Sequence, residues 1–136
     1  MLVLGGFSAH HPPVTPAAGS DLERLGEDRV RRLVATFMER VFADPMIGFY
    51  FQGRPLLRIR ELEARFALAH LGGGDVYTGR PLEEAHAGLS IFGGHFDRRT
   101  ALLKETLLED GVDLDIVGRW LDHTEAQRAR VVDGVC

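Results

Sequence analysis

Apolar residues recur along this chain at the spacing of a helix, and glycine and proline interrupt the pattern. Within residues 28–43 the apolar positions follow one another at steps of three and four, which places them on one helical face. These positions are Val30, Leu33, Val34, Phe37, Val41 and Phe42. No segment shows the strict alternation of apolar and polar residues that a half-buried strand requires. The pattern predicts an all-α fold in which long helices pair across short connections.

The same spacing predicts further helices between the breaks. They cover residues 55–71, residues 82–90, a segment from Phe96 to Gly111, and a segment capped by Asp113. Gly72-Gly73-Gly74 stops the first of these helices, and Gly93-Gly94 breaks the chain after the second. Gly118 in the last helix costs about 1 kcal/mol relative to alanine, which is consistent with a close approach of another element there.

Length, charge and cysteine content exclude several classes of protein. A chain of 136 residues fits one domain, and residues 1–19, which hold three prolines and three glycines, are predicted to form an irregular extension before a domain over residues 20–136. The net charge of −4 argues against a nucleic-acid partner, and no apolar run approaches the ~20 residues of a membrane span. The apolar segment at the N-terminus lacks the basic residue that precedes the apolar part of a secretion signal. The single cysteine, Cys136, has no second cysteine in the chain with which to form a disulfide. A cytoplasmic location is therefore expected.

One acidic residue interrupts the apolar face of the predicted helix over residues 55–71. Glu63 lies four residues after Ile59 and three before Phe66, within the apolar stripe. A buried carboxylate is costly unless it is paired or protonated, so Glu63 is a candidate functional residue. His70 lies on the same face beside the glycine stop, where an imidazole meets the carbonyl dipoles of a helix end.

A histidine occupies the inward face of the short helix predicted over residues 82–90. His86 follows Leu82 by four residues and precedes Leu89 by three, so it points towards the core. From the residues alone, such a histidine is as readily a hydrogen-bonded core residue as a metal ligand. Its separation from His95, with a glycine break between them, is poor geometry for a two-histidine metal site.

Four segments carry a resemblance to a known family. They read Ala-Thr-Phe-Met-Glu-Arg-Val-Phe-Ala-Asp-Pro at 35–45, Leu-Gly-Gly-Gly-Asp-Val-Tyr-Thr-Gly-Arg at 71–80, Glu-Ala-His-Ala-Gly-Leu-Ser-Ile at 84–91 and Gly-His-Phe-Asp-Arg at 94–98. From about Leu22 to Val132 the sequence resembles the truncated haemoglobins, most closely their group 1 branch. The last two segments are specific, because together they are similar to the proximal haem-binding stretch of the family and the start of its G helix. The resemblance implies a globin-like, two-over-two helical sandwich around haem b.

Carried over residue by residue, the resemblance assigns roles in haem binding. It makes His86 the proximal ligand of the haem iron, which would bind diatomic ligands (O2, NO, CO), and it places Phe51 against the haem face. Arg58 and Tyr77 match positions near the haem propionates, where a cation or a hydroxyl pairs with a carboxylate. The remaining matches are pocket-wall positions: Phe66, Leu82, Leu89, Ile91, Phe96, Leu103 and Leu107.

The distal side of the expected pocket departs from the family pattern. Typical members have a tyrosine and a glutamine that donate hydrogen bonds to bound dioxygen, whereas this sequence has Met38 and Glu63, with Ile59 at the gate position and Leu62 beside it. The side chains of Met38, Ile59 and Leu62 carry no donor, and Glu63 donates only when it is protonated. Plain oxygen storage is therefore not expected. Ligation of the iron by the Met38 sulfur is disfavoured, because a second axial ligand closes the site.

Three functional readings remain open. In the first, Glu63 is a general acid–base over the iron and assists peroxidase or NO dioxygenase-type chemistry, with a separate reductase as electron donor. In the second, Glu63 turns outward to Arg60 or Arg65, and an apolar pocket binds neutral gases such as NO or CO for sensing or detoxification. In the third, the chain has lost haem and keeps the helical bundle as a partner-binding domain, against which the intact segment around His86 argues. Nothing in the sequence bears on the oligomeric state.

Overall fold

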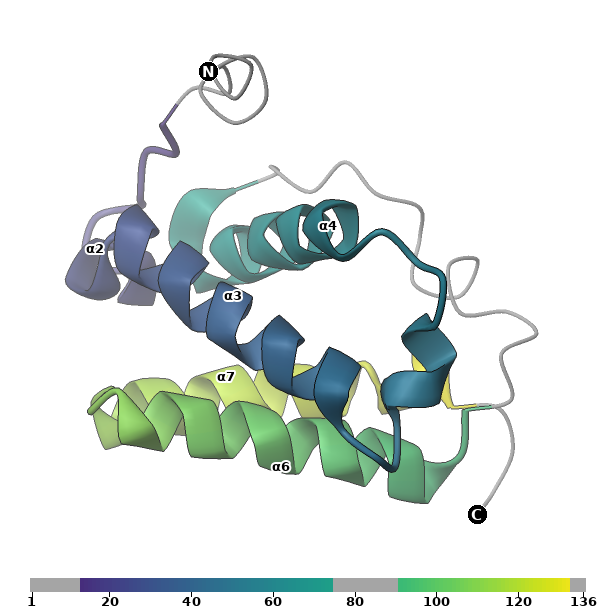
Figure 1. Ribbon diagram of the computed structural model, residues 1–136. Coiled ribbons are helices and arrows are strands. Elements are labelled where there is room, and N and C mark those ends of the chain that lie inside the picture. Colours follow the sequence, from purple (N-terminus) through teal and green to yellow (C-terminus); the bar gives the residue numbers. More distant parts are fainter. Residues whose placement is uncertain (1–12, 75–90, 133–136) are drawn as a thin grey trace, which may run out of the picture.

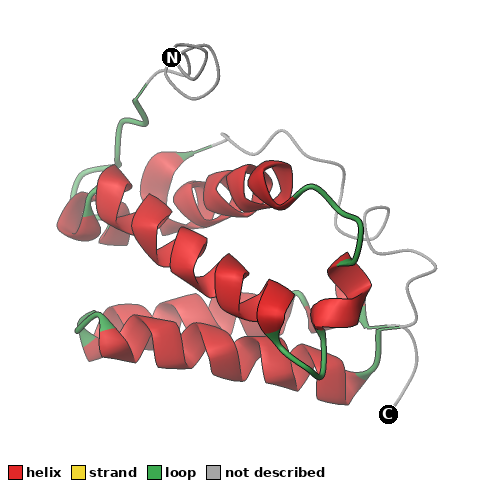
Figure 2. Cartoon of the chain, viewed as in Figure 1, coloured by secondary structure: helices red, strands yellow, loops and turns green. Residues whose placement is uncertain are grey.

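The computed structural model of the chain describes residues 13–74 and 91–132, and every regular element in these two ranges is helical (Figures 1 and 2). The elements are α2 (Asp21–Leu25), α3 (Glu27–Ala43), η1 (Gly48–Phe51), α4 (Leu56–Leu68), η2 (Ala69–Gly73), α6 (Gly93–Glu109), α7 (Leu114–Ala126) and α8 (Arg128–Val131). The predicted short helix over residues 82–90, with His86, lies outside the described residues. The all-α prediction is confirmed.

The long helices form two layers. Helix α3 packs against α4 in its own layer and against α6 in the other, and α6 packs against α7. In Figure 1, α3 and α4 lie above the α6–α7 pair. This is the two-over-two arrangement that the resemblance to the truncated haemoglobins implies. None of the helices described here is long and apolar enough to cross a membrane.

Helix α3 forms the centre of the core because its apolar stripe meets both layers. Glu27 and Asp28 in its first turn are favourable beside the positive end of the helix dipole. The buried face is made of Val30, Leu33, Val34, Phe37, Met38 and Val41. From the other layer, Ile116 and Trp120 of α7 complete the same apolar cluster. The helix begins one residue before the predicted segment and ends at the same residue.

A buried carboxylate organises the corner that follows α3. The Asp44 Oδ2 atom accepts hydrogen bonds from the backbone amides of Met46 (2.9 Å) and Ile47 (3.2 Å). Its Oδ1 atom accepts two hydrogen bonds from the Arg98 guanidinium, at 2.9 and 2.7 Å. Gly48 follows at a point where a Cβ atom would lie 2.5 Å from the Phe42 carbonyl oxygen, so only glycine lets the chain turn this closely. The corner therefore ties α3 to α6.

The end of α4 differs from the prediction in its detail. The regular helix stops at Leu68, and the widened turn η2 follows. Gly72 has a φ of 131°, in the region that favours glycine, and a Cβ atom there would collide with the side chain of Ser20. The segment before α2 lies on this turn, because the Ala17 amide donates to the Gly72 carbonyl oxygen at 2.9 Å. Residues 13–19 contain no helix but are docked at this point.

Two local predictions about glycines are wrong, and one about a helix cap is right in position but not in its hydrogen bond. Gly93 and Gly94 do not break the chain but form the first turn of α6, which begins at Gly93. Asp113 stands at the cap position of α7, but its side chain makes no cap hydrogen bond and instead accepts one from Arg24 at 2.9 Å. Gly118 is exposed, and no atom lies within 4 Å of a Cβ built on it, so no element approaches closely there.

Candidate functional site

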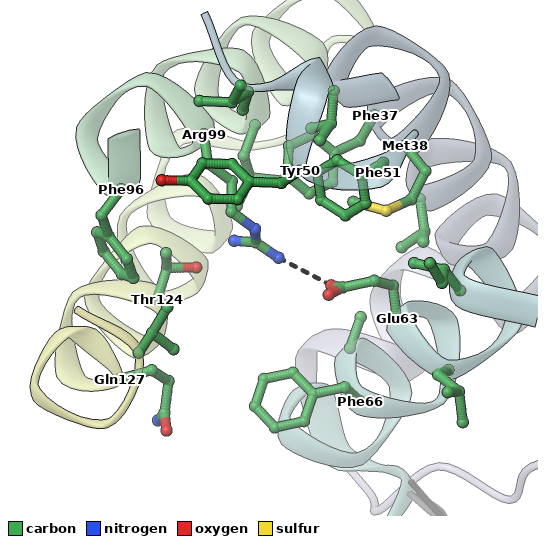
Figure 3. Close-up of a pocket in the computed structure, with 18 of the residues that line it drawn as sticks. Phe37, Met38, Tyr50, Phe51, Glu63, Phe66, Phe96, Arg99, Thr124 and Gln127 are labelled. Atoms are coloured by element: carbon green, nitrogen blue, oxygen red, sulfur yellow. Dashed lines mark hydrogen bonds and ion pairs between the residues drawn. The ribbon is translucent and has the colours of Figure 1, made fainter. Parts of the chain in front are cut away.

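A cavity of about 430 Å³ lies between the two helical layers. Side chains from α3, α4, α6 and α7 line it, and most of them are aliphatic or aromatic. Figure 3 shows aromatic rings on both sides of the opening, with Tyr50 and Phe51 facing Phe66 across it. A mostly apolar cavity with a few polar groups is the usual form of a small-molecule or cofactor site.

Most of the predicted site residues within the described ranges meet in this cavity. The lining includes Met38, Phe51, Arg58, Ile59, Leu62, Glu63, Phe66, Ile91, Phe96 and Leu103. Leu107 is fully buried in the core but is not part of the lining. The predicted iron ligand His86 and the predicted pocket residues Tyr77, Leu82 and Leu89 lie outside the described residues.

The carboxylate of Glu63 points into the cavity and meets a guanidinium from the opposite wall. Arg99 of α6 donates a hydrogen bond from Nη2 to Glu63 Oε1 at 2.8 Å (Figure 3). The predicted outward partners are engaged elsewhere, since Arg65 pairs with Glu61 at 2.9 Å and Arg60 lies 3.7 Å from Glu39. Of the alternatives left open by the sequence, the structure therefore does not have the outward orientation, and the carboxylate has a partner inside the cavity.

The ion pair between Glu63 and Arg99 is partly open to solvent. The two side chains are 29% and 27% exposed, and pairs of this kind stabilise a fold by only about 0.2–1 kcal/mol. The guanidinium has a second support, because its Cζ atom lies 4.9 Å from the centre of the Phe37 ring. Arg99 is thus held in place by an aromatic face as well as by a carboxylate.

Sequence reasoning missed Arg99, although the pattern contained a signal. Arg99 lies three residues after Phe96 and four before Leu103, so the helical spacing places it on the same face as two predicted pocket residues. The arginines expected as partners of Glu63, Arg60 and Arg65, lie on its own helix. Arg99 meets Glu63 because α4 packs opposite α6. The spacing of residues within one helix does not predict how two helices pack.

The wall nearest to Glu63 is apolar, as the sequence predicts. Met38 is 1% exposed, and Ile59 and Leu62 line the cavity from α4. None of these side chains carries a hydrogen-bond donor. Tyr50 lines the cavity as well, but its hydroxyl already makes a 2.9 Å hydrogen bond with His95 Nδ1.

Two stacked imidazoles form another part of the lining. The ring centres of His70 and His123 lie 3.8 Å apart with the ring planes at 10°, and the Trp120 ring lies roughly perpendicular to His70, with ring centres 5.7 Å apart. Burial, followed by the charge of neighbouring His123, lowers the pKa of His70 from 6.5 to about 3, and burial also lowers the pKa of His123. Both rings are therefore neutral at pH 7. His70 lies at the helix end, as predicted, but its ring contacts are with other rings.

The charged lining residues are mostly cationic. Arg54, Arg58 and Arg99 line the cavity, and Glu63 is the acidic residue among the described lining residues. Neither Arg54 nor Arg58 makes an ion pair within the described part of the chain. Residues 13–74 and 91–132 contain no group of three or more histidine, cysteine or acidic side chains that could hold a metal ion. This lining suits a ligand that carries negative charge.

Comparison with known proteins identifies the family. Residues 22–129 match the bacterial-like globin family, which is most of the chain. The chain belongs to the bacterial-like globin family. Among curated relatives of this globin, the group 1 truncated hemoglobin of Tetrahymena thermophila is 31% identical over 106 residues, covering 75% of this chain and 88% of the relative. The group 1 truncated hemoglobin GlbN of a Synechocystis strain is 35% identical over 100 residues, covering 70% and 81%.

Solved truncated haemoglobins share the fold of this globin. The Fe(III) form of the Tetrahymena pyriformis truncated hemoglobin superposes with a TM-score of 0.79 at 27% identity, covering 85% of this chain and 99% of that chain. The 2/2 hemoglobin of Synechococcus sp. PCC 7002, whose structure has covalently attached heme, gives 0.76 at 26% identity, covering 82% and 95%. The predicted family and the two-over-two fold are confirmed.

Membership of this family implies a haem cofactor and a diatomic gas ligand, and the cavity of this globin is suited to haem. Its walls offer apolar and aromatic surface for a porphyrin, and its arginines offer cations for carboxylates. Within the described residues, no buried side-chain nitrogen or oxygen lacks a hydrogen-bond partner, so the apolar walls carry no unmet polar group. The residues present therefore fit a flat, apolar group with acidic substituents.

Proposed function

We propose that this globin binds haem b in the cavity between its two layers, with His86 as the axial ligand, and reduces peroxide with the help of Glu63. The observation that carries the proposal is the paired Glu63 and Arg99 inside an otherwise apolar cavity. A haem-free role as a partner-binding domain is disfavoured. Protein interiors are normally close-packed, and the 430 Å³ cavity between the layers is more readily explained by a bound cofactor.

The walls of the cavity would hold the haem by apolar contact. Phe51 and Phe66 offer ring faces on two sides of the opening, and Leu103 comes from the opposite layer. Arg58, which has no carboxylate partner among the described residues, would pair with a propionate, as would the hydroxyl of Tyr77. The structure adds Arg54 as a further cation for the same purpose.

Bound haem supplies an iron that binds diatomic ligands or peroxide and exchanges electrons with a separate reductase. The part of Glu63 in peroxide cleavage is to move a proton. Its Oε2 atom, the oxygen that does not accept the Arg99 hydrogen bond, would take the proton from one oxygen of hydrogen peroxide and return it to the other, which leaves as water. Two electrons from the reductase, supplied by way of the haem, and two protons from solvent would convert the remaining oxygen atom to a second water. Arg99 donates hydrogen bonds to the negative charge that builds up on the leaving oxygen. A well-placed acid–base group contributes about 10²–10⁴-fold.

A second candidate function is the binding of neutral gases such as NO or CO. The observation in its favour is the donor-free wall of Met38, Ile59 and Leu62 beside Glu63. Neutral diatomics need no charged donor, whereas a carboxylate close to bound dioxygen opposes its partial negative charge. A short-lived ferrous dioxygen complex is expected where the Glu63 carboxylate lies close to the bound ligand, and a long-lived one would contradict this interpretation of the pocket wall.

Haem binding is tested by reconstitution and visible spectroscopy. The wild-type globin is expected to show a Soret band, and His86→Ala is expected to lose the spectrum of a histidine-ligated iron. His95→Ala is the matched control, because His95 also lines the cavity but is hydrogen-bonded to Tyr50. Absence of a Soret band in the wild-type globin would remove both candidate functions.

The role of Glu63 is tested by peroxide turnover across pH. Glu63→Gln keeps the size of the side chain but cannot take up a proton, so turnover is expected to fall by 10²-fold or more. Glu61→Gln, on the same helix but outside the cavity lining, is expected to keep the wild-type rate. Equal turnover of Glu63→Gln and wild type would leave the gas-binding function.

A further inference from the structure

Arg99 is better equipped to bind a ligand than to hold the fold. Its guanidinium carries five N–H donors, and Nη2 donates to Glu63. The other donors have no hydrogen-bond partner among the described residues. Figure 3 shows the guanidinium reaching from the α6 wall into the opening of the cavity towards Glu63. Donors that face a cavity without partners form a site for an acceptor.

The position of the guanidinium does not depend on Glu63 alone. The Cζ atom of Arg99 lies 4.9 Å from the centre of the Phe37 ring, which supports the guanidinium through a cation–π contact. Phe37 itself is 2% exposed, so the ring is fixed by the core. If Glu63 turns away, Arg99 therefore keeps its place in the cavity. The ion pair is partly exposed and weak, so an incoming acceptor can replace the carboxylate.

The charge of the lining favours an anion as that acceptor. Three arginines and one glutamate are the charged lining residues in the described ranges, and His70, which lines the same cavity, is neutral at pH 7. Because Glu63 offsets only one of the three arginines, the lining keeps a positive balance of charge, which attracts an anion. A ligand that stays neutral on the iron, such as CO, gains little from this arrangement. The Arg99 site therefore separates ligands by charge.

We propose that Arg99 selects small anionic ligands, such as nitrite or azide, by exchanging its hydrogen bond to Glu63 for one to the incoming anion. This inference rests on the proposed binding of haem, since the iron is the second point of attachment for the ligand. Glu63 acts as a competitor that occupies the donors until an anion arrives. The two residues thus have opposite effects on anion affinity.

The test is an optical titration of the ferric, haem-loaded protein with sodium azide and with sodium nitrite. Arg99→Leu is expected to weaken both anions about tenfold, because one charge-assisted hydrogen bond is lost. Glu63→Gln removes the competing charge and is expected to tighten both anions severalfold. The affinity of the ferrous protein for CO, a neutral ligand, is expected to change less than twofold in either variant.

Arg60→Leu is the matched control for loss of positive charge. Arg60 is 33% exposed, lies near Glu39 on the neighbouring helix, and does not line the cavity, so its replacement is expected to leave azide affinity unchanged. Azide affinity of Arg99→Leu within twofold of wild type, with a normal Soret band, overturns the inference and leaves haem binding intact. Equal losses for azide and CO also overturn it, because they indicate general damage to the pocket.

Two results separate the inference from the function on which it rests. If the wild-type protein shows no Soret band, haem binding fails and the inference fails with it. If Arg99→Leu does not fold, Glu63→Gln decides the question, because unchanged or weaker azide binding by that variant contradicts competition between the carboxylate and the anion.

Discussion

Two consecutive arginines of α6 make ion pairs in two different regions of the molecule. Arg98 binds Asp44 at the corner after α3, and Arg99 binds Glu63 across the cavity. Asp44 is 2% exposed and also accepts two backbone amides, whereas Glu63 is 29% exposed and makes its ion pair without such support. The Asp44 carboxylate is fixed by hydrogen bonds from the backbone, whereas the Glu63 carboxylate can change partner without breaking such bonds.

The comparison shows that an ion pair is structural or functional according to what else its carboxylate does. At the corner, Arg98 and the amides of Met46 and Ile47 hold the pKa of Asp44 below its ordinary value of 3.8, although burial opposes them. At the cavity, the partner of Arg99 can be lost without leaving a backbone donor unpaired. Stability is therefore expected to depend on the corner, and ligand choice on the cavity.

The largest expected difference is in the free energy of unfolding. Asp44→Ala removes the partner of two amides and one guanidinium, and is expected to destabilise the protein by about 3 kcal/mol. Glu63→Ala is expected to cost less than about 1 kcal/mol. Urea titrations at pH 7 of the two variants measure both values, and similar losses would contradict the distinction between the two regions.

The sequence predicted the helices better than it predicted their partners. The bounds of α3 agree with the apolar spacing to one residue, because burial of one helical face is a local pattern. The pairing of Glu63 with Arg99 joins residues 36 positions apart and depends on how α4 and α6 pack, which no local pattern encodes. The glycines at the start of α6 show a similar limit, since a glycine pair fits both a break and a first helical turn.

The expected roles of the pocket residues divide in the same way. The spacing places apolar residues such as Ile59 and Phe96 on helical faces, and the resemblance to the family assigned them to the pocket, whose lining includes both. The stacking of His70 on His123 could not be predicted, because His70 lies in η2 and His123 in α7, two segments far apart in the chain. The role of His86 stays a prediction that rests on the resemblance of its segment to the family.

Acid sensitivity is expected to separate the two regions further. Burial, and then the charge of His123, lower the pKa of His70 from an ordinary 6.5 to about 3, although the charge of Asp21 opposes them. The unfolded chain therefore binds a proton at His70 more readily than the folded protein does. Stability is therefore lost as the pH falls from about 6.5 towards about 3. The loss from pH 7 to pH 5 is expected to be about 2 kcal/mol.

His70→Gln is the variant that tests this dependence. Urea titrations at pH 7 and pH 5 are expected to give a smaller difference for His70→Gln than for wild type. The lowered pKa of Asp44 does not contribute in this range, because its effect is lost only as the pH falls below 3.8. His123→Gln, which removes the neighbouring ring and its own lowered pKa, is expected to reduce the difference as well. The same pH dependence in all three proteins would contradict the assignment to the cavity.

The smallest expected effect concerns the ring under Arg99. Phe37→Leu removes the face on which the guanidinium lies, so the donors sample more orientations before an anion binds. Azide affinity of the haem-loaded protein is expected to fall by about twofold to fivefold. Phe96→Leu is the matched control, because Phe96 also lines the cavity and also supports an arginine. The Cζ atom of that arginine, Arg128, lies 4.7 Å from the centre of the Phe96 ring, but Arg128 does not pair with Glu63. Equal azide affinities of the two variants would show that Arg99 is positioned by Glu63 alone, and the carboxylate could then not be exchanged without losing the donor.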